Sequence, residues 1–226
     1  MPIIVSEKGI KSKIKLGERV AVVENIKYPY FESEKHKKLC KKMNDFYLWA
    51  AEKYSYYVRN KLPKKIRLSA RKRNLPLTLS MCYTVAHCDE KIISVVLDLS
   101  LSDGKNIKKR RFSQLWSVKS ADILPLSEFM KRGREVREKI YDFVLGCARK
   151  NGDNNAFGYY DDYIKRLEKN FNPKNCFVTP KGLCFFIDAG ILSPPKYSSC
   201  NFVMGFDLLE DVVNADFLPK SSEKTV

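Results

Sequence analysis

The sequence is poor in the residues that mark fibrous, metal-binding and membrane-spanning proteins. Only 10 of its 226 residues are Gly and 10 are Pro, which excludes collagen-like and low-complexity chains. Histidine occurs twice and no Cys-x-x-Cys pair is present, so the ligand spacing of a typical zinc site is missing. No stretch approaches the roughly 18 apolar residues that cross a bilayer. We therefore expect neither a metal cofactor nor a membrane span.

The motifs of common catalytic and phosphate-binding sites are also missing. The sequence contains no G-x-S-x-G, no G-x-x-x-x-G-K and no G-x-G-x-x-G. His87 stands beside Cys88, but neighbouring residues of a strand point to opposite faces, which separates a base from its nucleophile. We therefore expect a protein that is not an enzyme and binds no cofactor, with a hydrolase at His87 and Cys88 as the least favoured reading.

Cysteine usage and the N-terminus bear on the compartment. Seven cysteines occur, an odd number, and most stand among apolar neighbours, as Cys184 does beside Phe185 and Phe186. This usage is typical of buried reduced thiols rather than of a disulfide framework. The first twenty residues are interrupted by Lys and Glu and lack the apolar run of a signal peptide. These features predict a cytoplasmic protein.

Composition is that of a folded protein with an uneven charge. Hydrophobic residues make up 44% of the chain and charged residues 30%, enough apolar material for a core. The net charge is +16, of which residues 1–150 contribute 34 − 16 = +18 and residues 151–226 contribute 8 − 10 = −2. Such asymmetry is compatible with a polyanionic partner, and equally with a solvated Lys-rich surface that has no dedicated partner.

Hydrophobic periodicity predicts an α+β fold, with antiparallel sheets packed against two long helices and shorter C-terminal helices. The predicted strands are 19–28, ended by Pro29, then 77–86, 91–101 and 106–118, followed in the tail by 176–179, 183–188 and 202–206. The predicted helices are one carrying the apolar stripe from Leu39 to Val58, then 127–150, 160–171 and 207–213, the last capped by Asp207. Residues 1–124 and 125–218 are expected to form two halves, packed closely enough to make one unit, with a frayed tail at 219–226.

Two basic clusters form the candidate polyanion-binding site. The first falls in 61–73, which holds seven positive charges and no acid, and the second follows a tight turn at Ser102–Gly104. The candidate residues are Lys64, Lys65, Arg67, Arg71, Lys72, Arg73, Lys108, Lys109, Arg110 and Arg111. If they converge, they form a surface that tracks phosphates without reading sequence. Tyr54, Tyr56 and Tyr57 precede the first cluster, and their rings are suited to stacking on bases.

The tail carries phrases that resemble a known bacterial family. Residues 175–213 (NCFVTPKGLCFFIDAGILSPPKYSSCNFVMGFDLLEDVV) contain a Thr-x-x-Gly-Leu turn at Thr179–Leu183, a proline-containing loop and a final strand. Upstream, YPYFESEKH, IISVVLDLSL and LPLSEFM are similar to that family's helix entry, central strand and helix start. The family includes the extracellular domain of the lysozyme-sensing anti-sigma factor RsiV and the non-catalytic domain of the peptidoglycan deacetylase PdaC.

The resemblance implies a binding or sensing module. In the deacetylase, catalysis resides in a separate domain, so similarity to the other domain implies no activity. The chain departs from the family after the central strand, where Asp103-Gly104-Lys105-Asn106 replaces the usual Gly-Gly-Ala-His phrase. We accordingly expect a non-catalytic module for an unknown protein or polymer ligand. The alternative is a basic protein that binds nucleic acid or another polyanion.

Overall fold

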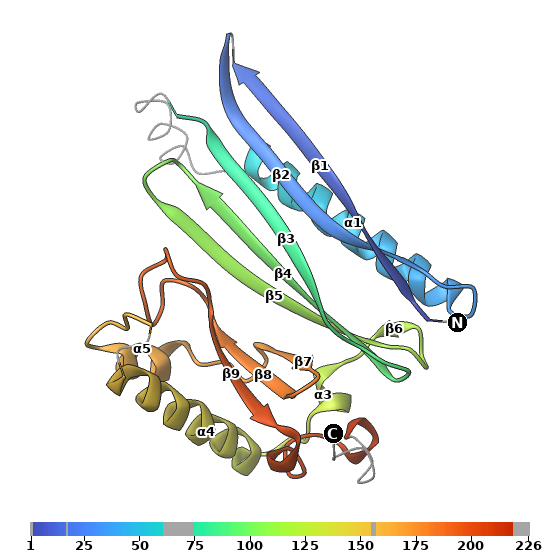
Figure 1. The fold of residues 1–226 in the computed structure, drawn as a ribbon, viewed down its shortest axis with the longest axis vertical. Helices are drawn as coiled ribbons and strands as arrows, with labels where there is room; N and C mark the ends of the chain where they lie inside the picture. Colours follow the sequence, from blue (N-terminus) through green and yellow to red (C-terminus); the bar gives the residue numbers. More distant parts are fainter. Residues whose placement is uncertain (1, 17, 61–74, 155–156, 219–226) are drawn as a thin grey trace. The chain divides into compact units, whose positions relative to one another are not determined.

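The computed structural model describes residues 2–16, 18–60, 75–154 and 157–218 (Figure 1). It confirms the predicted α+β class. The chain divides into two compact units: Met1–Val85 with Leu97–Phe112, and Ala86–Val96 with Ser113–Val226. The units are therefore interleaved along the chain, whereas the predicted halves 1–124 and 125–218 meet once; those halves stay a prediction.

The first unit is built on a long hairpin and one helix. Strand β1 (Ile4–Leu16) pairs antiparallel with β2 (Arg19–Glu32), and helix α1 (Lys37–Asn60) follows. Strand β3 (Leu77–Cys88) then pairs with β2 in parallel, in a register that sets Val22 opposite Leu77. The sheet order is β1-β2-β3-β4-β5-β6, with β4 (Ile92–Ser102), β5 (Ile107–Ser117) and β6 (Asp122–Ile123). The β2–β3 pair departs from the antiparallel arrangement that we expected.

Helix α1 packs its apolar stripe against this sheet, as its spacing of three and four predicts. Ala51 is fully buried in a cluster with Ile26 of β2 and with Leu79 and Met81 of β3. Tyr54 joins the same cluster, and its hydroxyl donates to the Ser100 carbonyl at 2.9 Å. These contacts fix one face of α1 and leave the opposite face for solvent.

Strand β1 was missed, and β2 is longer than predicted. Ile10, Ser12 and Ile14 lie on one face of β1, a spacing of two that is typical of a strand. Four lysines in the same strand lower the apolar content of the segment and obscure the pattern. Pro29 does not end β2, which continues to Glu32 with Pro29 opposite Glu7. Both backbone groups of Phe31 bond the Asn44 side chain instead of β1. Residues two apart in a strand present their backbone to the same side, so the missing N–H of Pro29 costs β2 no bond to β1.

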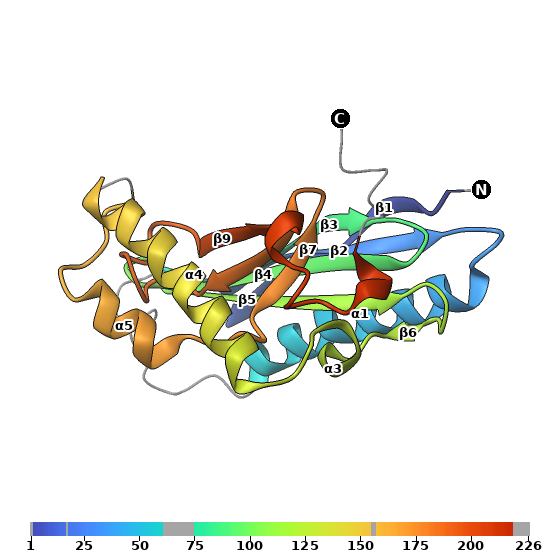
Figure 2. The same ribbon diagram turned by 90° about the horizontal axis from the view of Figure 1, so that it is seen from below.

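The second unit packs helices against a three-stranded sheet. Strands β7 (Cys176–Thr179), β8 (Gly182–Ile187) and β9 (Cys200–Gly205) form an antiparallel sheet in that order. Helix α4 (Arg134–Asp153) lies along it (Figure 2). Its Ile140 and Val144 share a core with Phe185 and Phe202. The predicted strand–turn–strand at Thr179–Gly182 is thus confirmed.

The predicted helix 127–150 is wrong in its first turns. Helix α3 (Leu126–Phe129) ends at Met130, which is extended and forms a β-bridge with Val213. Helix α4 begins after Gly133, whose φ of 144° is accessible to glycine and strained for other residues. The bridge to a residue 83 positions away is a tertiary contact, and helical periodicity carries no signal of it.

The C-terminal helices are shorter than predicted. Helix α5 spans Tyr163–Asn170. In place of a helix over 207–213, the chain forms the 3-10 turns η1 (Phe206–Leu208) and η2 (Ala215–Phe217), and Gly205 rather than Asp207 precedes η1. None of the helices in the described residues combines the length and the apolar character that crossing a membrane requires.

Candidate functional site

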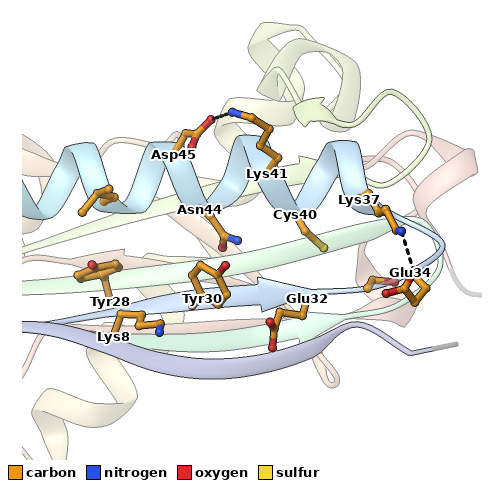
Figure 3. A pocket seen from close by; sticks show the side chains of 12 residues that line it. Lys8, Tyr28, Tyr30, Glu32, Glu34, Lys37, Cys40, Lys41, Asn44 and Asp45 are labelled. Atoms are coloured by element: carbon orange, nitrogen blue, oxygen red, sulfur yellow. Dashed lines mark hydrogen bonds and ion pairs between the residues drawn. The ribbon is translucent and has the colours of Figure 1, made fainter.

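A groove of about 500 Å3 lies between α1 and the β1–β2 hairpin in the first unit (Figure 3). Strand β2 supplies the side chains of Tyr28, Tyr30 and Glu32, and β1 supplies Lys8. These residues line one side because the even positions of β2 point toward α1, as Ile26 does. The remaining lining residues come from α1 and from the segment just before it: Ser33, Glu34, Lys37, Cys40, Lys41, Asn44, Asp45 and Leu48.

Asn44 fixes the position of α1 along β2. Its Oδ1 accepts from the Phe31 N–H at 2.7 Å, and its Nδ2 donates to the Phe31 carbonyl at 3.0 Å. One side-chain amide thereby bonds both backbone groups of Phe31, which face away from β1. A further strand would satisfy the same two groups in the same way. The groove wall is held by two directional bonds rather than by apolar contact alone.

The groove combines aromatic faces with balanced charge. Lys8 places its ammonium 5.0 Å from the centre of the Tyr30 ring. Two ion pairs line the rim, Lys37 with Glu34 at 2.8 Å and Lys41 with Asp45 at 2.6 Å. Three lysines thus face three carboxylates, so the groove has no net formal charge.

A polar group inside the groove wall is unpaired. The Ser33 hydroxyl oxygen is buried and has no hydrogen-bond partner among the described residues. Buried hydroxyls are normally paired, because leaving one unpaired costs desolvation free energy. Among the described residues, the Ser33 hydroxyl is therefore an unsatisfied polar group that the groove wall covers from solvent.

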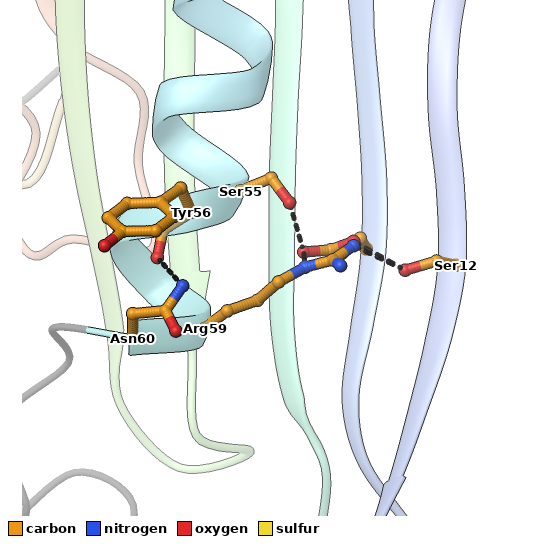
Figure 4. Close-up of polar contacts among 6 residues, drawn as sticks. Ser12, Ser55, Tyr56, Arg59 and Asn60 are labelled. Carbon is orange, nitrogen blue, oxygen red and sulfur yellow. Dashed lines mark hydrogen bonds and ion pairs between the residues drawn. The ribbon is translucent and has the colours of Figure 1, made fainter.

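A buried carboxylate lies further along the same hairpin (Figure 4). The side chain of Glu24 is fully buried, and Arg59 of α1 binds it through Nε at 2.9 Å and also through Nη2. Ser55 donates to Oε1 at 2.8 Å and Ser12 donates to Oε2 at 2.5 Å. The bonds from Arg59, aided by both hydroxyls, lower the Glu24 pKa to about 2 against the cost of burial. This cluster ties β1, β2 and α1 together.

The predicted basic clusters are described in part. Lys64, Lys65, Arg67, Arg71, Lys72 and Arg73 lie outside the described residues. On β5, Lys108 and Arg110 are exposed, while Lys109 and Arg111 are half-buried at the alternate positions. Arg111 binds the Asp98 carboxylate through Nε at 2.7 Å and Nη2 at 2.8 Å. The four residues are therefore divided between the two faces of the strand, and their binding to polyanions stays a prediction.

The tyrosines proposed for stacking also differ in exposure. Tyr54 is held inward by its bond to Ser100, whereas Tyr56 and Tyr57 are about half-exposed, at 56% and 48%. A stacking role is therefore open to Tyr56 and Tyr57 only.

His87 and Cys88 lie at the β3–β4 turn of the second unit. The His87 Nε2 contacts Asp89 Oδ2 at 2.9 Å, and Asp89 Oδ1 accepts from the N–H groups of Lys91 and Ile92, each at 2.7 Å. Partial loss of hydration, aided by the Asp89 charge, raises the pKa of the Cys88 thiol, which disfavours the thiolate although the residue is exposed. Asp89 therefore caps the turn, and the His87 ring nitrogen that the structure describes in a hydrogen bond contacts Asp89 rather than the Cys88 thiol.

Sequence reasoning missed the groove residues Tyr28, Tyr30 and Asn44. Tyr28 and Tyr30 are two apart and so share one face of a strand, but Pro29 between them predicts the end of that strand. Nothing in the sequence distinguishes Asn44 from the other polar residues of α1, because its role depends on the position of β2.

No protein-family model matches the chain, and no curated protein matches its sequence. Its fold is similar to solved structures of DUF3298 family proteins. The protein from Pseudomonas aeruginosa aligns with a TM-score of 0.67 at 13% identity, over 97% of this chain and 98% of its own. The protein from Bacteroides fragilis aligns with a TM-score of 0.67 at 10% identity, over 94% of each chain.

At these identities the likeness shows the fold alone.

Proposed function

We propose that the chain is a non-catalytic binding module of the RsiV/PdaC type, and that it holds a neutral polar polymer segment in the groove between α1 and β2. The observation that carries the proposal is the charge-balanced lining around Tyr28 and Tyr30. Aromatic rings offer flat contact surfaces, and fixed polar groups beside them supply orientation and specificity.

The charge balance separates this groove from a polyanion site. A polyanion requires an excess of cations, and three carboxylates line this groove beside three lysines. A segment rich in hydroxyl or amide groups meets both kinds of partner without leaving a charge buried and unpaired.

The proposal is tested by titrating isotope-labelled protein with a neutral oligosaccharide and, separately, with an uncharged hydrophilic peptide. Supporting results are saturable amide shifts at Tyr28–Ser33 and Cys40–Asn44, at least ten-fold weaker binding in Tyr30→Ala, unchanged binding in Tyr197→Ala, and ligand recovered intact by mass spectrometry. Tyr197 is a matched control because it is 40% exposed and belongs to the second unit. Shifts that avoid the groove in both titrations, or a ligand that is cleaved, contradict the proposal.

A second candidate function is polyanion binding by β5, favoured by the exposure of both Lys108 and Arg110 on one face of the strand. Retention on immobilised DNA at low salt should fall when Lys108 and Arg110 are changed together to Gln. Lys165→Gln with Lys169→Gln, which removes two cations from α5, serves as the control. Equal retention of both double variants, or no retention of the native chain, removes this candidate.

We further propose that the protein acts in the cytoplasm, supported by its seven cysteines, none of which forms a disulfide. A membrane-impermeant maleimide should label the exposed Cys82 and Cys88 only after lysis of cells that express the native gene. Labelling of intact cells contradicts this location.

A further inference from the structure

Strand β1 forms one end of the six-stranded sheet, and within the described residues it pairs with β2 alone. It is 13 residues long, which is long for an edge strand. Long edge strands are either protected against further pairing or used for it.

The register shows which backbone groups of β1 point outward. Phe31 gives both its N–H and its carbonyl to Asn44, so its pair with Val5 is one in which the two strands do not bond each other. Such pairs alternate along an antiparallel ladder. The outward residues are therefore Val5, Glu7, Gly9, Lys11 and Lys13, before the register shifts at Ile14/Lys15.

The charge along this edge has one predominant sign. Two of the outward residues, Lys11 and Lys13, are exposed lysines. Two further exposed lysines belong to the same strand: Lys8 lies between the outward residues Glu7 and Gly9, and Lys15 follows the last of them. The one acid among the outward residues, Glu7, is paired with Lys27 of β2 at 3.0 Å. An incoming strand thus meets a row of amides that pair with no other strand in the described part of the chain, beside several lysines.

This charge selects the occupant. A second copy of the chain paired through β1 would bring the lysines of two edges together, and like charges across strands destabilise the pair. An acidic strand would instead place carboxylates beside the lysines while its backbone bonds the outward row. The row extends over nine residues, about 30 Å at ~3.4 Å per residue.

We propose that β1 binds an extended acidic segment of a partner protein, which adds to the sheet as a further strand beyond β1. Main-chain hydrogen bonds to the outward residues supply affinity, and the lysines supply selection. This inference does not depend on the groove, because the outward row lies on the other edge of β1 from β2.

The test uses the full chain and a blocked peptide of about nine residues in which Glu alternates with Thr, a length that matches the row. We expect saturable binding, with the largest amide shifts and new exchange protection at Val5, Glu7, Gly9, Lys11 and Lys13. N-methylation of every second residue removes the N–H donors from one edge of the peptide, so two such peptides can be made, one for each edge. One of the two should bind at least ten-fold more weakly than the unmethylated peptide, because the donors that pair with β1 are lost. A Lys/Thr peptide should not bind.

Variants separate backbone pairing from charge. Lys11→Pro with Lys13→Pro removes two outward donors and should abolish binding. The variant should still fold, because proline is tolerated where the N–H of an edge strand faces solvent. Lys11→Thr with Lys13→Thr keeps the donors and should weaken binding several-fold. Lys105→Thr, at an exposed turn of the same unit, should leave binding unchanged.

Three results overturn the inference: no binding at millimolar peptide, equal binding of peptides N-methylated on either edge, or shifts outside β1. The first would mean that the lysines only protect the edge, and the second that attraction is by charge without pairing. The peptide comparison uses the native chain and stands even if the proline variant does not fold. Failure here leaves the groove titrations untouched, since those follow shifts at Tyr28–Asn44.

Discussion

The Arg59 guanidinium binds the buried Glu24 carboxylate with two of its nitrogens, joining the last turns of α1 to the middle of β2. The Glu24 side chain is fully buried, while that of Arg59 is 41% exposed. The carboxylate is therefore bonded by protein donors in place of water. The described donors are Ser55 and Arg59 of α1 and Ser12 of β1.

Removing Arg59 should destabilise the first unit. Arg59→Ala leaves a buried carboxylate with only the two serine hydroxyls, and a loss of about 3 kcal/mol in unfolding free energy is expected. Chemical denaturation followed by circular dichroism measures it. Arg134→Ala, which breaks a pair in which Arg134 is 89% exposed, is the control and should change stability little. Equal effects of the two substitutions would contradict a structural role for the Glu24 cluster.

Stability should depend on pH through Glu24. Its pKa is about 2 in the folded chain and near the ordinary value of 4.5 in the unfolded chain. The unfolded state therefore binds the proton first as pH falls, so the contribution is complete above about pH 5 and is lost toward pH 2. Unfolding free energies across that range should fall less steeply in Glu24→Gln than in the native chain. Glu7→Gln, at a half-exposed pair, should keep the native slope; parallel slopes in all three proteins would argue against the assignment.

Replacing Asn44 should reduce the unfolding free energy more than replacing an asparagine on an exposed helix surface. Asn44→Ala leaves the Phe31 N–H and carbonyl without their partner, at an expected cost of about 1–3 kcal/mol. Asn170→Ala removes a single bond to a backbone carbonyl at the end of α5 and should cost much less. Exchange of the Phe31 amide should accelerate in Asn44→Ala alone. Unchanged protection at Phe31 would show that α1 does not cover this edge.

Gly182 should resist substitution. Its φ is +137°, and a Cβ would lie 2.1 Å from the Met204 carbonyl oxygen of the neighbouring strand. Gly182→Ala must therefore strain the turn and displace β9, at an expected cost of about 2–4 kcal/mol. Gly146→Ala is the matched control, because nothing lies within 4 Å of its Cβ and alanine favours a helix. A neutral Gly182→Ala, measured by thermal unfolding, would contradict the described turn.

Local patterns predicted the elements that local chemistry determines. The stripe on α1 and the Thr179–Gly182 turn were readable because apolar spacing and turn residues act over a few positions. The break at Met130, the parallel β2–β3 pair and the continuation of β2 past Pro29 depend on partners that are distant in sequence. The groove was unreadable for the same reason, since Asn44 acquires its role only when Phe31 lies beside it.

The interleaving of the two units restricts how the gene can be divided. One unit contains residues on both sides of 86–96, and the other contains residues on both sides of 97–112. A single cut anywhere between Val85 and Ser113 consequently deprives at least one unit of a strand segment. A cut at the midpoint, between Phe112 and Ser113, would therefore leave the second unit without residues 86–96, and a ribosome must pass Phe112 before the first unit is complete.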